Sequence, residues 1–152
     1  MNLSFIIPTL NEERTLLSNL IFLKRIRKYL NAELIVVDGG SHDSTVNIAK
    51  TLSCNVYISE PSRSKQFNLG AKHASGKYLV FLHADTILDN DAIDHLKKIK
   101  KNTQWGFFSI KIKSNNCKYK ILSALINIRS RLFNYATGDQ VMIVENNFFY
   151  RV

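Results

Sequence analysis

The chain has 152 residues, 45% of them hydrophobic and 22% charged, a composition typical of one soluble globular domain with a single core. It has no apolar run of about 18 residues, and its apolar start breaks at Pro8, so the sequence indicates neither a transmembrane span nor a signal peptide and predicts a cytoplasmic location. The net charge of +9, concentrated in the second half, favours an anionic partner.

The first predicted elements are a strand and a helix. Residues 3–7 form a short apolar run that is typical of a strand buried on both faces. Asn11 is the expected cap of the next helix, with Glu12 in its first turn and Asn31 at its end. Its apolar residues recur at helical spacing: Leu16, Leu20, Leu23, Ile26 and Leu30.

The alternation of strand and helix then continues. The pattern predicts strands over residues 33–38, 55–59 and 77–85, a helix over about 43–52, and another through Gln66, Leu69 and Ala74. Gly76 is expected to cap that last helix in the left-handed conformation. Four strands joined by three helices imply an α/β fold with a mostly parallel sheet and helices on both faces.

Beyond Asp85 the pattern loosens. It predicts a helix over residues 91–101, a strand over 105–113, a helix over 118–135 and a short strand over 141–144. A subdomain specific for a substrate is expected in this part. Cys54 and Cys117 stand far apart and lack metal-site spacing, so both are expected to be buried or half-buried free thiols.

Several polar residues follow the predicted strands. Since ligands bind beyond the carboxyl ends of parallel strands, Pro8, Thr9, Glu12, Asp38 and Asp85 should meet at one edge of the sheet. Two interpretations fit the Asp38 carboxylate, which either accepts hydrogen bonds from a ligand such as a ribose or uracil, or caps the following turn. Its place at a strand end favours the ligand.

Asp85 ends an almost wholly apolar strand, where an unpaired carboxylate is costly to bury. A divalent cation, Mg²⁺ or Mn²⁺, held together with a diphosphate is a natural partner, although a helix cap is an alternative. His83 is either a second ligand or a structural histidine, and the second interpretation is favoured because imidazole suits softer metals.

The segment "RSKQFNLGAKHASG" places Arg63 and Lys65 at a helix start, with Gln66 and Asn68 close behind. These side chains either reach a pyrophosphate or form a solvated helix start. The sequence contains no Walker loop, no GxGxxG and no GxSxG, which argues against kinases, ATPases, dinucleotide dehydrogenases and serine hydrolases.

Taken in order, the motifs resemble those of bacterial family 2 glycosyltransferases, in the short group with "SxIIPxLNEE", "VVDGGSxDxT", "RxxQxNxGA" and "FLHAD". The likeness covers residues 1–88 closely and continues at "GDQ", residues 138–140. It implies a Rossmann-like GT-A fold in one domain, with a nucleotide-sugar-binding part over residues 1–88 and a partial acceptor-side part over 89–152.

The resemblance also implies roles for individual residues. Pro8, Thr9 and Glu12 would lie near the base and ribose of a UDP- or GDP-sugar, and Asp38 would hold the nucleoside. Arg63, Gln66 and Asn68 would face the nucleotide-sugar. In "FLHAD", Ala84 and Asp85 belong to the donor site, and Asp85 takes the metal-binding position, with His83 where the wider family has an acid.

Related enzymes transfer a sugar with inversion to an acceptor hydroxyl, and a carboxylate takes the acceptor proton. In those enzymes the base lies in a Glu-Asp motif that comes later than the position of Val152, so the resemblance implies a C-terminally truncated member. Asp139 is then the remaining candidate for the base. The alternative is a nucleotide-sugar-binding remnant or module without turnover.

The resemblance leaves the acceptor open among a glycan, a lipid and a small molecule, and cell envelope glycan synthesis is the expected setting. The helix over residues 118–135 carries an apolar stripe beside lysines and arginines, which fits contact with an anionic membrane at its inner face as well as packing on the sheet. No nucleic acid is expected, because no nucleic-acid motif accompanies the lysine clusters.

Overall fold

The computed structural model describes residues 3–99, 102–112, 114 and 116–151. The strands are β1 (Leu3–Thr9), β2 (Ala32–Asp38), β3 (Asn55–Ile58), β4 (Tyr78–Phe81), β5 (Trp105–Phe107) and β6 (Met142–Glu145). The helices are α1 (Glu13–Leu30), α2 (Thr45–Thr51), α3 (Arg63–His73), α4 (Asn90–Lys97), α5 (Cys117–Phe133) and α6 (Asn146–Phe149).

The strands form one six-stranded sheet in the order β3-β2-β1-β4-β6-β5. The first four strands are parallel to one another, whereas β6 runs antiparallel to both β4 and β5. The predicted α/β fold with a mostly parallel sheet is confirmed. The strand order reverses beside β1, where the chain passes from β2 and β3 on one side to β4 on the other.

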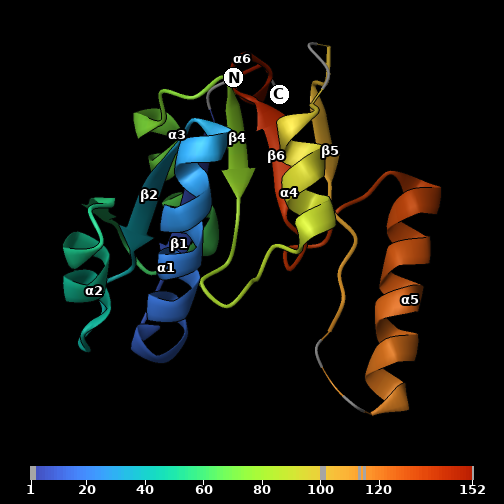
Figure 1. The fold of residues 1–152 in the computed structure, drawn as a ribbon, viewed down its shortest axis with the longest axis horizontal. Coiled ribbons are helices and arrows are strands. Elements are labelled where there is room, and N and C mark those ends of the chain that lie inside the picture. The colour runs from blue at the N-terminus through green and yellow to red at the C-terminus, as the bar shows by residue number, and fades with distance from the viewer. Residues whose placement is uncertain (1–2, 100–101, 113, 115, 152) are drawn as a thin grey trace.

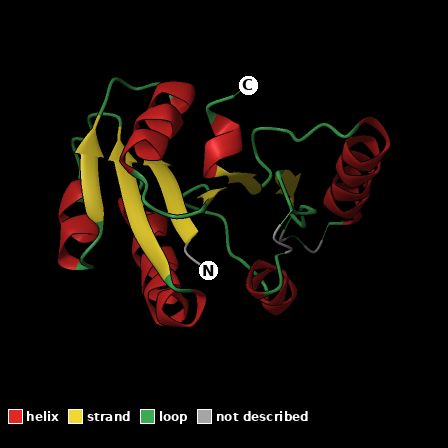
Figure 2. Ribbon diagram, turned by 90° about the horizontal axis from the view of Figure 1, so that it is seen from above, coloured by secondary structure: helices red, strands yellow, loops and turns green. Residues whose placement is uncertain are grey.

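Helices cover both faces of the sheet (Figures 1 and 2). The larger core lies between the sheet and α1, α2 and α4, where Leu16, Leu20 and Leu23 of α1 are fully buried. The smaller core lies on the other face, where Ala71 of α3 packs on Ile6 and neighbouring strand residues. Every residue of β1 is buried, as expected for a central strand covered on both sides.

The boundaries of α1 differ from the prediction at its start. Asn31 ends the helix in a left-handed conformation with φ of 47°, as predicted. The helix begins after Glu12, not after a capping Asn11. Asn11 itself has a φ of 56°, and its side-chain oxygen accepts from the backbone N–H of His42, so it joins two loops and caps no helix.

The predicted left-handed cap at Gly76 is also wrong. Helix α3 ends at Ala74 in an extended conformation, and Gly40 is the glycine with positive φ, at 92°, among the described residues. A Cβ atom on Gly76 would lie 2.5 Å from the Ser4 hydroxyl oxygen and 2.7 Å from the backbone of Leu3. Gly76 therefore allows the chain to pass close to β1.

The part of the chain after β4 departs most from the predicted boundaries. Strand β4 ends at Phe81, so His83 and Asp85 lie in a loop beyond it. Helix α4 ends at Lys97 and is capped by Lys98, so the predicted helix over 91–101 does not include residues 98–99, and residues 100–101 lie outside the described residues. Strand β5 spans only Trp105–Phe107, because Ile110 then pairs its backbone with a side chain of α5 instead of a strand.

Candidate functional site

A cleft of about 1570 Å³ opens at the edge of the sheet toward which β1 and β4 run. It extends from the end of β1, past the start of α3 and the loop after β4, to β5 and the segment after it. The sequence-predicted residues that line it are Pro8, Thr9, Glu12, Arg63, Gln66, His83, Ala84, Asp85 and Asp139. Two predicted residues do not line it: Asp38 is fully buried, and Asn68 is exposed on α3.

Asp38 is held by a full set of hydrogen bonds. Its Oδ1 accepts from the hydroxyls of Thr9 at 2.9 Å and Ser41 at 2.5 Å, and its Oδ2 accepts from the backbone N–H groups of Gly40 and Ser41 at 2.9 and 2.7 Å. The side chain is 0% exposed. In this structure Asp38 therefore caps the turn after β2, and contact with a ligand requires some of these bonds to exchange.

Gln66 joins three elements behind the cleft. Its side-chain amide donates to the backbone carbonyls of Thr9 and Val37, each at 2.8 Å, and the residue is buried. These carbonyls lie at the ends of β1 and β2, and that of Thr9 also accepts from the backbone N–H of Gly39 at 2.8 Å. Gln66 thereby fixes the start of α3, and with it Arg63, against the strand ends.

Glu12 lies just beyond the end of β1. Its Oε2 accepts from the Thr15 hydroxyl at 2.6 Å, and its backbone N–H donates to Thr45 at 2.8 Å. The Thr45 hydroxyl in turn donates to Asp43 at 2.5 Å, and this bond lowers the pKa of the Asp43 carboxyl below its usual value. The loops after β1 and β2 are thus hydrogen-bonded to each other at the mouth of the cleft.

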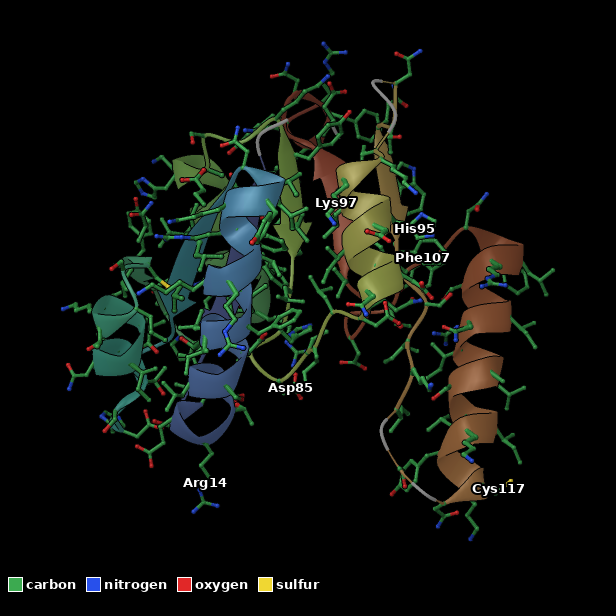
Figure 3. The ribbon with its side chains drawn as sticks, in the orientation of Figure 1. Arg14, Asp85, His95, Lys97, Phe107 and Cys117 are labelled. Atoms are coloured by element: carbon green, nitrogen blue, oxygen red, sulfur yellow. The ribbon has the colours of Figure 1, made fainter. Side chains whose placement is uncertain are left out.

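A side chain of α1 holds the loop after β4 in place by hydrogen bonds. The side-chain amide of Asn19 donates to the carbonyl oxygens of His83 at 3.3 Å and Ala84 at 3.1 Å. Asp85 follows at once, on the loop that joins β4 to α4, at the end of the molecule toward which β4 points (Figure 3). Its carboxylate is exposed and has no hydrogen-bond partner among the described residues.

His83 reaches across the cleft. Its Nε2 contacts the carbonyl oxygen of Gly138, and its ring packs edge-to-face against Phe67 with centroids 5.8 Å apart. The histidine therefore connects the loop after β4 to residues 138–140. In this arrangement Nε2 is occupied, which fits the structural interpretation of His83 better than metal ligation.

The carboxylates in the cleft that have no partner among the described residues are those of Asp85 and Asp91, and Asp85 lies on the loop after β4. The described residues contain no group of three or more histidine, cysteine or acidic side chains placed to hold a metal. Asp89 also lines the cleft, but its carboxylate caps α4 by accepting from Ala92. A hard cation that takes one carboxylate from the protein and its other oxygens from phosphates and water fits Asp85.

Residues 138–140 form the far wall of the cleft. Gln140 is 2% exposed, and its Oε1 accepts from Ser130 of α5 and from the backbone N–H of Thr137, while its amide donates to the Phe108 carbonyl. Asp139 lies on this hydrogen-bonded loop, and its Oδ1 is 3.7 Å from the guanidinium of Arg63. The side chain of Asp139 is 73% exposed and that of Arg63 is 61% exposed.

Both basic and acidic side chains line the cleft, and its carboxylates are those of Glu12, Asp85, Asp89, Asp91 and Asp139. Besides Arg63, its lining includes the basic side chains of Lys98, Lys111 and Arg131. They come from α3, from the end of α4 and from the acceptor-side part, so an anion in the cleft would meet positive charge on several sides.

Sequence analysis did not single out several of these residues. Asn19 carried a signal, since it is a polar residue on the apolar stripe of α1. Gln140 had no such signal in the sequence, apart from its place beside Asp139. Lys98, Lys111 and Arg131 belonged to basic clusters whose position over the cleft depends on tertiary packing.

Comparisons with known proteins show the family to which the chain is similar. The family model described as "Glycosyl transferase family 2" matches residues 4–140. The poly-beta-1,6-N-acetyl-D-glucosamine synthase of Staphylococcus epidermidis RP62A is 32% identical over 111 residues, which are 68% of this chain and 27% of that protein. The synthase of the same name from Staphylococcus aureus COL is 33% identical over 99 residues, 59% of this chain and 23% of that one. The chain thus spans about a quarter of these relatives.

Two solved structures are similar. S. aureus TarS 1-349 in complex with UDP-GlcNAc has a TM-score of 0.52 and 26% identity, covering 62% of this chain and 29% of its own. The glucosyl-3-phosphoglycerate synthase of Mycobacterium tuberculosis, in complex with Mn²⁺, UDP and glucosyl-3-phosphoglycerate, has a TM-score of 0.67 and 18% identity, covering 96% and 57%. The second likeness is one of fold.

Proposed function

The chain belongs to glycosyl transferase family 2, as its motifs predicted, and from this we propose that it binds a nucleotide-diphospho-sugar in the cleft and transfers the sugar to an acceptor hydroxyl. Its fold is the predicted GT-A type, matched over 96% of the chain by a solved relative. The observation that carries the proposal is the cleft, which gathers Asp85, Arg63 and the end of β1 at the carboxyl edge of the sheet.

The proposed donor is a UDP- or GDP-sugar. Thr9, Pro8 and Glu12, at the end of β1, are the proposed neighbours of the base and ribose, with Asp38 beneath them. Arg63 is the proposed diphosphate contact. The similar TarS structure contains UDP-GlcNAc, which supports UDP as the first nucleotide to test. Residues 1–88 form the proposed donor part, and residues 89–152 the acceptor-side part.

The proposed cofactor is Mg²⁺ or Mn²⁺ at Asp85. Such an ion supplies a positive charge that stabilises the departing diphosphate. Asp85 would hold it on one side, and Asn19, by fixing the carbonyls of His83 and Ala84, would hold Asp85 in place. Arg63 and Lys98 would add positive charge to the same anion.

The proposed reaction inverts the anomeric carbon. The acceptor oxygen loses its proton to a carboxylate and bonds to the anomeric carbon, while the bond to the diphosphate breaks on the opposite side and its electron pair leaves with the diphosphate. Asp139 is the proposed base, because it lines the same cleft as Asp85. The proposed location is the cytoplasm. Free thiols at Cys54 and Cys117 support it, because the cytoplasm is a reducing compartment.

A second candidate is a module that binds the donor without turnover. The observation that favours it is the ion pair of Asp139 with Arg63, which directs the carboxylate at a cation and away from an acceptor. The two candidates share the donor site and differ only in whether sugar leaves the nucleotide.

Calorimetric titration tests the donor site. UDP, GDP and UDP-GlcNAc are titrated into the wild type and into Asp85→Ala, with and without Mn²⁺. Asp94→Ala is the matched control, because Asp94 is an exposed aspartate on α4 outside the cleft lining. Binding that needs both Mn²⁺ and Asp85 supports the proposal, and no binding of any nucleotide contradicts it. Release of UDP from UDP-GlcNAc then separates enzyme from module.

A further inference from the structure

Helix α5 contacts the rest of the protein through its polar side. Its Asn127 exchanges two hydrogen bonds of 2.8 Å with the backbone of Ile110, and Ser123 accepts from the backbone N–H of Ile112 at 3.1 Å. Ser130 bonds Gln140, and Arg131 bonds Ser109. The residues of α5 that are buried are Ser123 and Ser130. The side of the helix that faces the protein is therefore mainly hydrophilic, with Ile126 as its half-buried apolar residue.

The opposite side of α5 is apolar and faces solvent. Its outward residues, between 45% and 73% exposed, are Ile121, Leu122, Leu125, Ile128, Leu132 and Phe133. Both ribbon views show α5 standing at one end of the molecule, away from the helices that cover the sheet (Figures 1 and 2). The sequence left open whether this stripe packs on the sheet, and the structure excludes that for the described residues. A surface helix of a globular protein normally has the reverse arrangement.

The positive charge is concentrated in the part of the sequence that includes α5, although Lys98, Lys111 and Arg131 of this part line the cleft. Residues 95–138 contain ten lysines and arginines and no aspartate or glutamate, whereas the rest of the chain carries 11 basic and 12 acidic side chains. The net charge of +9 therefore resides in this one segment. Within α5 itself, Lys118, Lys120, Arg129 and Arg131 have no acidic neighbour along the helix.

We propose that α5 binds the surface of a membrane rich in anionic lipids, with its aliphatic residues in the boundary between headgroups and acyl chains. An outward apolar face and an excess of lysine and arginine are together the two features of a helix that lies in a membrane interface. Lys118 and Arg129, which lie among the apolar residues, have side chains long enough to keep their charges at the headgroups.

The same features argue against the other partners. A second copy of the chain would bring two such cationic segments together, which repel. A nucleic acid would satisfy the charge but leave the leucines and isoleucines in water, since phosphates and bases offer no aliphatic surface. No described helix is both long and apolar enough to cross a membrane, so α5 would lie on the lipid surface. The inference goes beyond the proposed function and does not depend on turnover.

Flotation of the full chain with lipid vesicles tests the proposal. Vesicles of phosphatidylcholine are compared with vesicles that contain three parts phosphatidylcholine to about one part phosphatidylglycerol, at low and at high salt. We expect flotation with the anionic vesicles only, and its loss near 1 M salt, where screening shortens the reach of charge to about 3 Å. Leu125→Ser should weaken partitioning about tenfold, and Lys118→Gln and Arg129→Gln about fivefold each.

Tyr29→Ser is the control, because Tyr29 is 82% exposed on α1, far along the chain from α5, and its loss should leave flotation unchanged. Circular dichroism checks that each variant is folded. Equal flotation with both kinds of vesicle, or with neither, overturns the proposal. So does a light-scattering mass of two chains that Leu125→Ser reduces to one in the absence of flotation, or binding of a poly(U) probe that the same variants abolish while vesicles stay unbound.

Discussion

Thr9 and Asp38 end neighbouring strands, face each other in the β1–β2 register, and share a buried hydrogen bond of 2.9 Å from the Thr9 hydroxyl to the carboxylate. The bond joins the end of β2 to the end of β1, and the latter lines the cleft. It also means that Asp38 has a structural task that is separate from any contact with a nucleotide.

Replacing Asp38 should therefore cost stability as well as binding. Asp38→Ala removes the acceptor of two hydroxyls and two backbone N–H groups, and we expect the free energy of unfolding to fall by about 2 to 4 kcal/mol. Thr9→Val, which removes one of these donors, should cost about 1 kcal/mol. Urea denaturation followed by circular dichroism measures both. An Asp38→Ala midpoint equal to that of the wild type would contradict the capping role.

Replacing Arg63, in contrast, should weaken nucleotide binding with little loss of stability. Its ion pair with Asp139 is exposed, so Arg63→Gln should change the free energy of unfolding by less than about 0.5 kcal/mol. If Arg63 contacts the diphosphate, UDP should bind the variant about tenfold more weakly in calorimetry. Lys65→Gln is the matched control, since Lys65 lies on the same turn of α3, pairs with Glu60 and does not line the cleft. Equal weakening by both changes would point to general charge.

Glu33 should make stability depend on pH. Burial raises the pKa of its carboxyl, but hydrogen bonds from Ser4 and Ser75 outweigh that effect and lower the pKa below its usual 4.5. A pKa that is lower in the folded state means stability that is present above the unfolded pKa and lost as pH falls through the folded one.

Comparison of wild type with Glu33→Gln measures this effect. Near pH 7 the wild type should be more stable by about 1 kcal/mol, because the charged carboxylate accepts bonds from Ser4 and Ser75 at 2.6 to 2.8 Å. The difference should shrink as pH falls below about 4.5. A difference that stays constant from pH 7 to pH 3 would show that the charge of Glu33 contributes nothing.

The two thiols should react at different rates. Burial raises the pKa of Cys54 to about 11, an effect that nearby Arg27 and Lys24 only partly offset, so this thiol stays protonated at pH 8. Cys117 is exposed at the start of α5. We expect Ellman's reagent at pH 8 to modify one thiol of the native protein, and a second only in denaturant. Cys117→Ser should abolish the fast phase, whereas Cys54→Ser should preserve it.

The donor half of the fold followed from the sequence because its signals are local. Apolar runs bounded by turn residues gave β1 to β4, and Asn31 marked the end of α1 as predicted. The order of the sheet did not follow: β6 lies between β4 and β5 and runs antiparallel to both. Strand order is decided by tertiary packing, and the run of residues 141–144 predicts a strand without its neighbours.

The sequence predicted several of the residues that line the candidate site, but not what each of them does there. Strand ends brought Thr9 and Asp85 to one cleft, as the topology of parallel strands requires. The sequence had no means of showing that Asp38 is fully bonded within the protein while Asp85 is free, because partners such as Ser41 depend on the course of a loop. Similarly, periodicity revealed the stripe on α5 but not the direction in which it faces.

The place of β6 in the sheet has a consequence for folding during synthesis. Strand β5 pairs only with β6 among the described strands, and β6 comes 35 residues later in the chain, counted from Phe107 to Met142. Until Met142–Glu145 leaves the ribosome, Trp105–Phe107 has no strand to join and β4 keeps an open edge, which is a site for wrong pairing with other chains. We expect nascent chains that stop before β6 to need a chaperone, whereas the β3-β2-β1-β4 half can form as soon as β4 is made.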